Sequence, residues 1–327
     1  MSKNFNFIEV CAGAGGLSSG FINTGFKPIL LNDNNKNCCE TLKLNHKNIN
    51  VFNGSMLDID CEKYKNKIDI LMGGVPCQAF SQAGKRKGIK DDRGKLFLHF
   101  IKMIDEINPK IFLIENVKGL LSLDKGKTFK YILNEFEKIN KYNIKYKVLN
   151  ANDYGVAQNR LRLIIIGVHK NIKKEFSFPK IQDYKPILKD VLMNCPKSEG
   201  SSYNKLKADV LKLVPQGGCW IDLPKDVQKS YMGASYNSGG GRRGIAKRLD
   251  MNKPCLTILC SPQQKQTERC HPLETRPLQI LESARIQSFP DNYKFYGSLA
   301  QKYKQIGNAV PPKMAKVIAE EVYKVLQ

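Results

Sequence analysis

The chain has 327 residues, 42% of them hydrophobic, which suits one large domain or one domain with a smaller partner. Lysine and arginine number 53 against 30 acidic residues, a formal net charge of +23. This charge favours a polyanionic partner such as nucleic acid, because phosphates release counterions when basic side chains neutralise them; a solvated lysine-rich surface is the alternative. No apolar run reaches membrane-spanning length and no signal-peptide core follows Met1, so we expect a cytoplasmic protein with reduced cysteines.

Short apolar runs alternate with amphipathic stretches in the first half of the chain. Seven runs are predicted as strands, at residues 5–11, 28–32, 49–52, 68–72, 111–114, 144–149 and 161–168. Between them, apolar residues repeat at helical spacing over 96–107 and 129–136. This alternation predicts an α/β fold with a doubly wound, mostly parallel sheet.

The pattern changes after about residue 180. We predict a catalytic and cofactor-binding domain over 1–185, a smaller irregular domain over 186–276, a hinge over 277–303, and a C-terminal helix over 304–327 that completes the first domain. The irregular segment concentrates basic residues: Arg242, Arg243, Lys247, Arg248, Lys253, Lys265, Arg269 and Arg276. Cys255, Cys260, Cys270 and His271 fit no standard zinc spacing, so no metal is predicted.

A glycine-rich loop, Cys11 to Gly16, follows the first strand. Glycines permit a tight strand-to-helix turn and the close approach of a ligand to the backbone. Asp33 ends the second strand, where a carboxylate can accept hydrogen bonds from the ribose of a nucleoside cofactor. At this point NAD and S-adenosylmethionine are both allowed.

Two polar clusters leave the ends of other apolar runs. Cys77 lies in Pro76-Cys77-Gln78, just after the run at 68–72, and Glu115 begins Glu115-Asn116-Val117. A single cysteine is by default a small buried hydrophobe. At the end of a parallel strand beside a carboxylate, however, it suggests a nucleophile assisted by an acid.

With these motifs the chain resembles the DNA (cytosine-5)-methyltransferase family over nearly its whole length. The motifs occur in the family's order: the glycine loop, residues 76–81, residues 115–117, Gln158-Asn159-Arg160-Leu161-Arg162, residues 276–291 and residues 307–311. The resemblance implies a Rossmann-like methyltransferase core that uses S-adenosylmethionine, with a smaller irregular target-recognition domain. The sequence is thus identified as a member of this family.

The resemblance also implies roles for the polar residues. The Cys77 thiolate would attack carbon 6 of a flipped-out cytosine, which activates carbon 5 toward the methyl group. Glu115 would donate a proton to ring nitrogen 3, and one arginine of the pair Arg160 and Arg162 would hold the base's carbonyl oxygen. A structural salt bridge is the alternative for this pair.

The predicted cofactor site is Cys11, Ala12, Gly13, Gly15, Gly16, Asp33, Asn34, Ser55, Met56, Pro76, Leu96, Asn308 and Ala309. Three positions depart from the family: Cys11 replaces a common phenylalanine, Ser55 an adenine-binding aspartate, and Asn34 a frequent aromatic residue. We therefore expect adenine to be held less tightly, or Asp58 to serve in a shifted arrangement.

The predicted DNA contacts are Ser81, Gln82, Lys85, Arg86, Lys87, Arg93, Arg242, Arg243 and Thr257. Residues 82–94 resemble the family's mobile loop, which closes over DNA. The leading hypothesis is a modification enzyme of a bacterial restriction-modification system, monomeric, acting on duplex DNA, with any cognate restriction endonuclease sharing the site without a stable complex. Methylation of cytosine in tRNA is the alternative, and a non-enzymatic nucleic-acid-binding module is a third reading.

Overall fold

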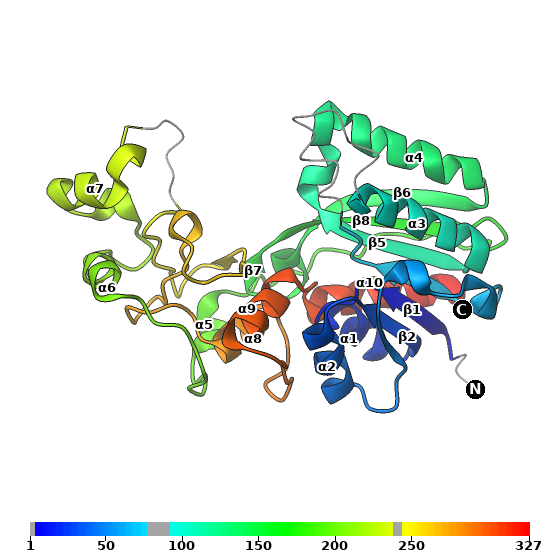
Figure 1. Ribbon diagram of the computed structural model, residues 1–327, viewed down its shortest axis with the longest axis horizontal. Coiled ribbons are helices and arrows are strands. Elements are labelled where there is room, and N and C mark those ends of the chain that lie inside the picture. Colours follow the sequence, from blue (N-terminus) through cyan, green and yellow to red (C-terminus); the bar gives the residue numbers. More distant parts are fainter. Residues whose placement is uncertain (1–3, 77–91, 238–243) are drawn as a thin grey trace.

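The computed structural model describes residues 4–76, 92–237 and 244–327, and has two lobes joined by a narrower middle (Figure 1). The larger lobe contains a seven-stranded sheet of order β3-β2-β1-β4-β5-β8-β6. All neighbouring strands pair in parallel except β8, which runs antiparallel to both β5 and β6. The predicted doubly wound, mostly parallel sheet is confirmed. The strands are β1 (Asn6–Val10), β2 (Lys27–Asp33), β3 (Val51–Asn53), β4 (Ile70–Gly73), β5 (Ile111–Val117), β6 (Tyr142–Asn150) and β8 (Leu161–His169).

Helices cover both faces of this sheet (Figure 1). The helices α3 (Asp92–Ile107) and α4 (Lys127–Ile139) pack on one face, where Phe100 and Ile132 belong to the same apolar cluster as Ile8 of β1. The helices α1 (Gly16–Ile22) and α10 (Pro312–Leu326) pack on the other. Helix α2 (Lys36–Asn45) follows β2. The sheet is buried on both faces, which explains its nearly continuous apolar strands.

The end of the chain forms two helices where one, over 304–327, was predicted. Helix α9 (Leu299–Asn308) ends before Ala309, whose backbone is extended, and α10 begins at Pro312. Two prolines in succession explain the break, because a residue before proline avoids the helical conformation and proline cannot donate a helical hydrogen bond. Helix α10 buries its apolar face in the apolar cluster of the large lobe.

The segment predicted as a separate domain has short elements: α5 (Leu188–Leu192), α6 (Lys205–Lys212), α7 (Lys225–Met232) and β9 (Cys255–Leu256). Helices α6 and α7 lie in the smaller lobe (Figure 1), whereas α5 packs against α8 (Ile280–Ile286). The smaller lobe has a small apolar cluster of its own, which includes Leu211, Met232 and Ile245. The strand β9 pairs with β7 (Gln158–Asn159), so the segment is tied directly to the large lobe beside the arginine pair.

Arg248 is buried in the core of this lobe. Its guanidinium donates to the carbonyl oxygens of Val214 (2.8 Å), Leu211 (2.6 Å), His271 (3.1 Å) and Glu274 (3.0 Å), and to the hydroxyl of Thr275 (2.9 Å). These five bonds join the segment of Arg248 to the C-terminal end of α6 and to residues 271–275. Arg248 therefore has a structural role in the core of this lobe.

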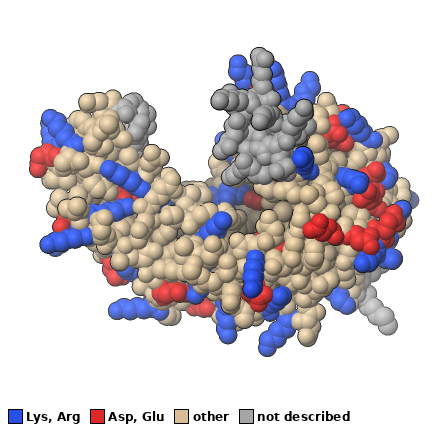
Figure 2. Space-filling view, viewed as in Figure 1, with Lys and Arg blue, Asp and Glu red and all other residues tan. Residues whose placement is uncertain are grey.

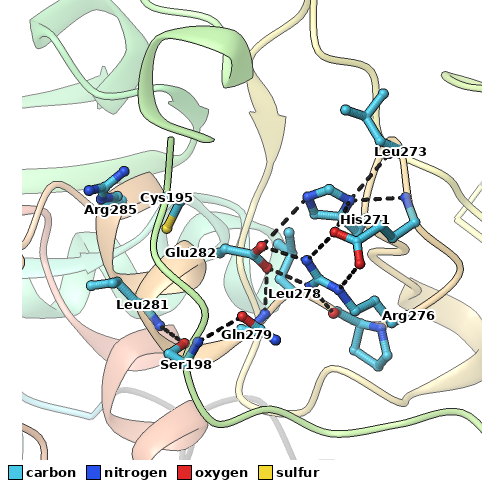
Figure 3. Close-up of polar contacts among 12 residues, drawn as sticks. Cys195, Ser198, His271, Leu273, Arg276, Leu278, Gln279, Leu281, Glu282 and Arg285 are labelled. Carbon is cyan, nitrogen blue, oxygen red and sulfur yellow. Dashed lines mark hydrogen bonds and ion pairs between the residues drawn. The ribbon is translucent and has the colours of Figure 1, made fainter. Parts of the chain in front are cut away.

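A second arginine joins the small lobe to α8 (Ile280–Ile286) (Figure 3). Arg276 donates to both carboxylate oxygens of buried Glu282, at 2.8 and 2.7 Å, and to Glu274. Glu282 also accepts from the backbone N–H of Gln279 (2.7 Å) and faces the ring of His271. This network fixes the start of residues 277–303, the segment predicted as a hinge, so Arg276 is engaged inside the protein.

Figure 2 shows a notch between the two lobes, with lysine and arginine side chains on the small-lobe side. Among the described residues, no helix is long and apolar enough to cross a membrane. In the same part of the chain, no three histidine, cysteine or acidic residues lie close enough together to hold a metal ion.

Candidate active site

A cavity of about 470 Å³ lies at the carboxyl ends of the parallel strands. Ligands of open α/β sheets bind at this edge, because loops diverge there and leave a crevice. The cavity collects residues from β1, β2, β5, β8, α1, α2, α3 and α9, and from the segment that follows β4. The predicted cofactor residues that line it are Cys11, Ala12, Gly13, Asp33, Asn34, Ser55, Met56, Pro76, Leu96, Asn308 and Ala309.

The glycine loop and Asp33 form one hydrogen-bonded unit. The Asp33 carboxylate accepts from the backbone N–H groups of Gly13 (2.9 Å) and Asn35 (2.8 Å), one at each oxygen. Burial raises the pKa of Asp33 from its ordinary value, and the two N–H donors oppose that rise. Gly13 has a φ of 56°, and a Cβ placed on it would meet open space, so the loop exposes its backbone to the cavity.

Gly15 and Gly16 were also predicted to bind the cofactor, but they do not line the cavity. Gly16 packs against the carbonyl group of Val310, where a Cβ would come within 2.0 Å of the oxygen. This side of the loop serves packing, since close contact between α1 and the α9–α10 connection leaves no room for a side chain.

Glu9 lines the cavity and was missed by the sequence analysis. It is 2% exposed, and its Oε2 atom has no hydrogen-bond partner. Burial raises the pKa of its carboxyl group to about 8, with smaller contributions from the negative charges of Asp33 and Glu115, while contacts with Ser18 oppose the shift. The signal in the sequence was a lone carboxylate inside an apolar central strand, Phe7-Ile8-Glu9-Val10.

The acid predicted to assist catalysis lies at the end of β5. Glu115 Oε1 is 2.7 Å from Arg162 Nε, and both side chains are nearly buried and line the cavity. The next residue, Asn116, donates from Nδ2 to the carbonyl oxygen of Val75 (2.9 Å), which ties the end of β5 to the segment after β4. Cys77, two residues beyond Val75, lies outside the described residues.

The structure separates the two arginines that were predicted as a pair. Arg162 faces the cavity, whereas Arg160 is fully buried and does not line it. Arg160 donates from Nη2 to the carbonyl oxygen of Gly307 (2.8 Å) and from Nη1 to that of Ile258 (3.4 Å). It thus joins the connection between β7 and β8 to α9 and to the segment after β9, and Arg162 is the one that faces the cavity.

The three departures from the family pattern meet in one part of the cavity. The Cys11 thiol points at the sulfur of Met56 (3.9 Å), and burial raises its pKa to about 12. The Ser55 hydroxyl accepts from the backbone N–H of Leu57 (3.2 Å). Asp58, considered as a substitute for the missing aspartate, is exposed and does not line the cavity.

Most predicted DNA contacts cannot be placed. Ser81, Gln82, Lys85, Arg86, Lys87, Arg242 and Arg243 lie outside the described residues, and Arg93 is in the first turn of α3 without a described side chain. Thr257 follows β9, and its hydroxyl donates to the carbonyl oxygen of Asn159 (2.8 Å).

Comparison with known proteins agrees with this geometry. Residues 5–324 match the family model described as C-5 cytosine-specific DNA methylase. The chain is 47% identical over 328 residues to the Type II methyltransferase M.Sau96I of Staphylococcus aureus, covering 98% of this chain and 76% of that protein. It is 45% identical over 331 residues to M.Eco47II of Escherichia coli, covering 98% and 79%.

Solved structures give the same result. A putative DNA modification methyltransferase encoded within a prophage of E. coli matches with a TM-score of 0.74 at 25% identity, over 99% of both chains. The Entamoeba histolytica methyltransferase EhMeth shares the fold, with a TM-score of 0.71 at 20% identity over 99% of both chains. The chain belongs to the C-5 cytosine-specific DNA methylase family.

Proposed function

We propose that this protein methylates carbon 5 of a cytosine within a short duplex DNA sequence, as the modification enzyme of a restriction-modification system. The observation that carries the proposal is the Glu115–Arg162 pair at the end of β5, tied through Asn116 to the segment that leads into Cys77. The named relatives are Type II methyltransferases, which supports DNA over tRNA as the acceptor. A cognate restriction endonuclease and a monomeric state belong to the same proposal.

The chemistry assigns each polar group one task. The Cys77 thiolate adds to carbon 6 of the extruded base, and the electron density that reaches nitrogen 3 is stabilised by a proton from Glu115. Arg162 orients Glu115 and presents its remaining N–H groups to the base carbonyl. After the methyl group is accepted at carbon 5, loss of the proton there restores the ring and releases the thiolate.

The charges of the cavity support S-adenosylmethionine as the methyl donor, which supplies its methyl group from a positively charged sulfonium. Three carboxyl groups, from Glu9, Asp33 and Glu115, line the cavity. The unpaired Oε2 of Glu9 offers an acceptor to a cation. A dinucleotide would bring a doubly negative pyrophosphate to the same surface, so NAD is disfavoured.

The two ends of the cofactor can be assigned within this cavity. Asp33 would accept the ribose hydroxyl groups while its other lone pairs keep the bonds from the glycine loop. Cys11, Met56 and Leu96 form an apolar corner for adenine. Lys304 of α9 also lines the cavity, and its positive charge opposes the rise in the pKa of Asp33, so it would supply a cation near the ribose.

We assign target recognition to the small lobe, residues 186–276. The first half of the chain supplies the groups that act on the cytosine, so discrimination among its neighbours must come from other loops. Arg248 and Arg276 are engaged inside the protein, which leaves the Gly-rich stretch with Arg242 and Arg243 as the proposed base-reading elements. Grafting 186–276 onto a related catalytic half should transfer the target sequence; a chimera that keeps the recipient's target would refute this assignment.

Covalent trapping tests the enzymatic proposal. Wild-type protein incubated with S-adenosylmethionine and target DNA containing 5-fluorocytosine should give a complex that survives denaturation, because fluorine cannot leave as a proton does. Cys77→Ala should give no such complex and no methyl transfer, yet should still bind DNA. Equal methylation of tRNA, or no trapped complex at a target established by bisulfite sequencing, would contradict the proposal.

A further inference from the structure

The glycine loop has two sides, and they have different surroundings. Cys11, Ala12 and Gly13 face the cavity, whereas Ala14 does not line it and belongs to an apolar cluster formed largely by residues 278–309. The carbonyl oxygen of Ala14 accepts a hydrogen bond of 2.5 Å from the hydroxyl of Tyr293. A side chain nearly 280 residues away in the sequence therefore holds the outer side of the loop.

Tyr293 is itself held firmly. Its ring packs against Phe289 (4.8 Å between centroids) and Phe295 (5.3 Å), and meets the ring of His46 edge-on. The next residue, Lys294, exchanges two backbone hydrogen bonds with the Asn45 side chain at the end of α2, at 2.7 and 2.9 Å. The position of the hydroxyl is thus set by contacts that do not involve the loop.

Tyr293 also shapes the loop sterically. Gly15 has a φ of 76°, and a Cβ placed on it would lie 2.9 Å from the Tyr293 hydroxyl and 2.7 Å from Leu42. Burial raises the pKa of the Tyr293 phenol above its ordinary value, so the hydroxyl keeps the proton that it donates to Ala14. In the conformation that the loop adopts beside Tyr293, the Gly13 N–H points at Asp33.

We infer that Tyr293 is a positioning residue for the cofactor site: its hydroxyl holds the Ala14 carbonyl and thereby orients Gly13 and, through it, the Asp33 carboxylate. The inference rests on the proposed use of S-adenosylmethionine. It gives residues 277–303, predicted as a hinge, a second role in holding the cofactor loop in its binding conformation. Through these contacts, residues 277–303 connect the small lobe to the glycine loop beside the cofactor cavity.

Tyr293→Phe tests the inference, with Tyr303→Phe as its matched control. Tyr303 is also buried, and its hydroxyl donates to Leu278 (2.7 Å) and accepts from Ser201 (3.1 Å), away from the glycine loop. By titration calorimetry, Tyr293→Phe should bind S-adenosylhomocysteine about three- to tenfold more weakly than wild type, and Tyr303→Phe should bind it as wild type does. Affinity for DNA should change in neither variant.

Hydrogen exchange separates this inference from the proposed function. The peptide containing residues 12–16 should exchange faster in Tyr293→Phe than in wild type or Tyr303→Phe, without any ligand. Failure of the wild type to bind S-adenosylhomocysteine would contradict the proposed function, while faster loop exchange would still support the role of Tyr293. Unchanged loop exchange in Tyr293→Phe, or equal loss of affinity in both variants, would overturn the inference.

Discussion

The two lobes use their charged side chains in opposite ways. In the large lobe, Glu9, Asp33 and Glu115 sit on a cavity, and each keeps part of its hydrogen-bonding capacity for a molecule that enters. In the small lobe, the guanidinium groups of Arg248 and Arg276 use most of their N–H donors in hydrogen bonds to oxygen atoms of the protein. The three carboxyl groups of the cavity therefore remain accessible to a ligand, whereas these two arginines hold segments of the small lobe together.

This difference shows why net charge alone is a poor guide to a nucleic-acid surface. The small lobe has short helices and a small apolar cluster, so its loops need internal hydrogen bonds to acquire one conformation. A guanidinium group with five donors satisfies several carbonyl groups at once. An arginine in this lobe can thus add to the positive charge of the sequence and still be unavailable for contact with DNA.

The largest effect is expected at the catalytic carboxyl group. Glu115→Gln preserves shape but cannot supply the proton to ring nitrogen 3, so the methyl-transfer rate should fall by about 10²- to 10⁴-fold. Single-turnover methylation of a target duplex measures this. Binding of S-adenosylhomocysteine and of DNA serves as the control and should stay within a few-fold of wild type. A rate within threefold of wild type would remove Glu115 from the mechanism.

The second effect concerns Arg248 in the core of the small lobe. Arg248→Met fills a similar volume but leaves five acceptors without their donor, which should lower the free energy of unfolding of this lobe by about 3–5 kcal/mol. Urea unfolding followed by Trp220 fluorescence reports on the lobe. Lys253→Met, an exposed control in the same segment, should change stability by less than about 0.5 kcal/mol. Because the cavity belongs to the large lobe, S-adenosylhomocysteine should still bind to Arg248→Met.

The third effect tests which aspartate serves the cofactor. Asp33→Ala should weaken S-adenosylmethionine binding by about 1–3 kcal/mol, because charge-assisted hydrogen bonds to the ribose are lost. Asp58→Ala removes an exposed carboxylate outside the cavity and should leave the affinity unchanged. Calorimetry measures the affinity of both variants for S-adenosylmethionine. Weaker binding by Asp58→Ala with unchanged binding by Asp33→Ala would support the shifted arrangement considered from the sequence.

The sequence pointed to those site residues that directly follow a strand of the large lobe. Each strand end of the large lobe carries a marker, such as the glycine loop, Asp33 or Glu115, because parallel strands bring their carboxyl ends to one edge. It could not separate Arg160 from Arg162, because residues two apart in a strand point to the same face and therefore predict a pair. In the structure Arg160 lies between β7 and β8, and its side chain turns inward to the carbonyl oxygens of Gly307 and Ile258. The two-residue pairing of β7 with β9 and the contact of Tyr293 with Ala14 join distant segments, and no periodicity marks them.

The smallest predicted effect comes from protonation of Glu9. With a pKa of about 8, its carboxyl group is mostly protonated at pH 7, because ionisation without a partner is costly at a buried site. A bound cation would favour the ionised form, so binding of S-adenosylmethionine should release up to one proton and tighten by up to about tenfold per pH unit between pH 6.5 and 8. The same raised pKa makes the folded state hold a proton that the unfolded state has lost, so stability without ligand should fall as pH rises from about 4.5 to 8.

Glu9→Gln imitates the protonated carboxyl group and is the decisive control for this coupling. In the variant, calorimetry in two buffers of different ionisation enthalpy should detect less proton release than in wild type, and the pH dependence of affinity should flatten. The other ionisable groups of the cavity remain in place, so any proton release that persists does not come from Glu9. If the variant and the wild type release the same number of protons, the bound cation does not interact with Glu9. Glu9 would then have no role in cofactor binding.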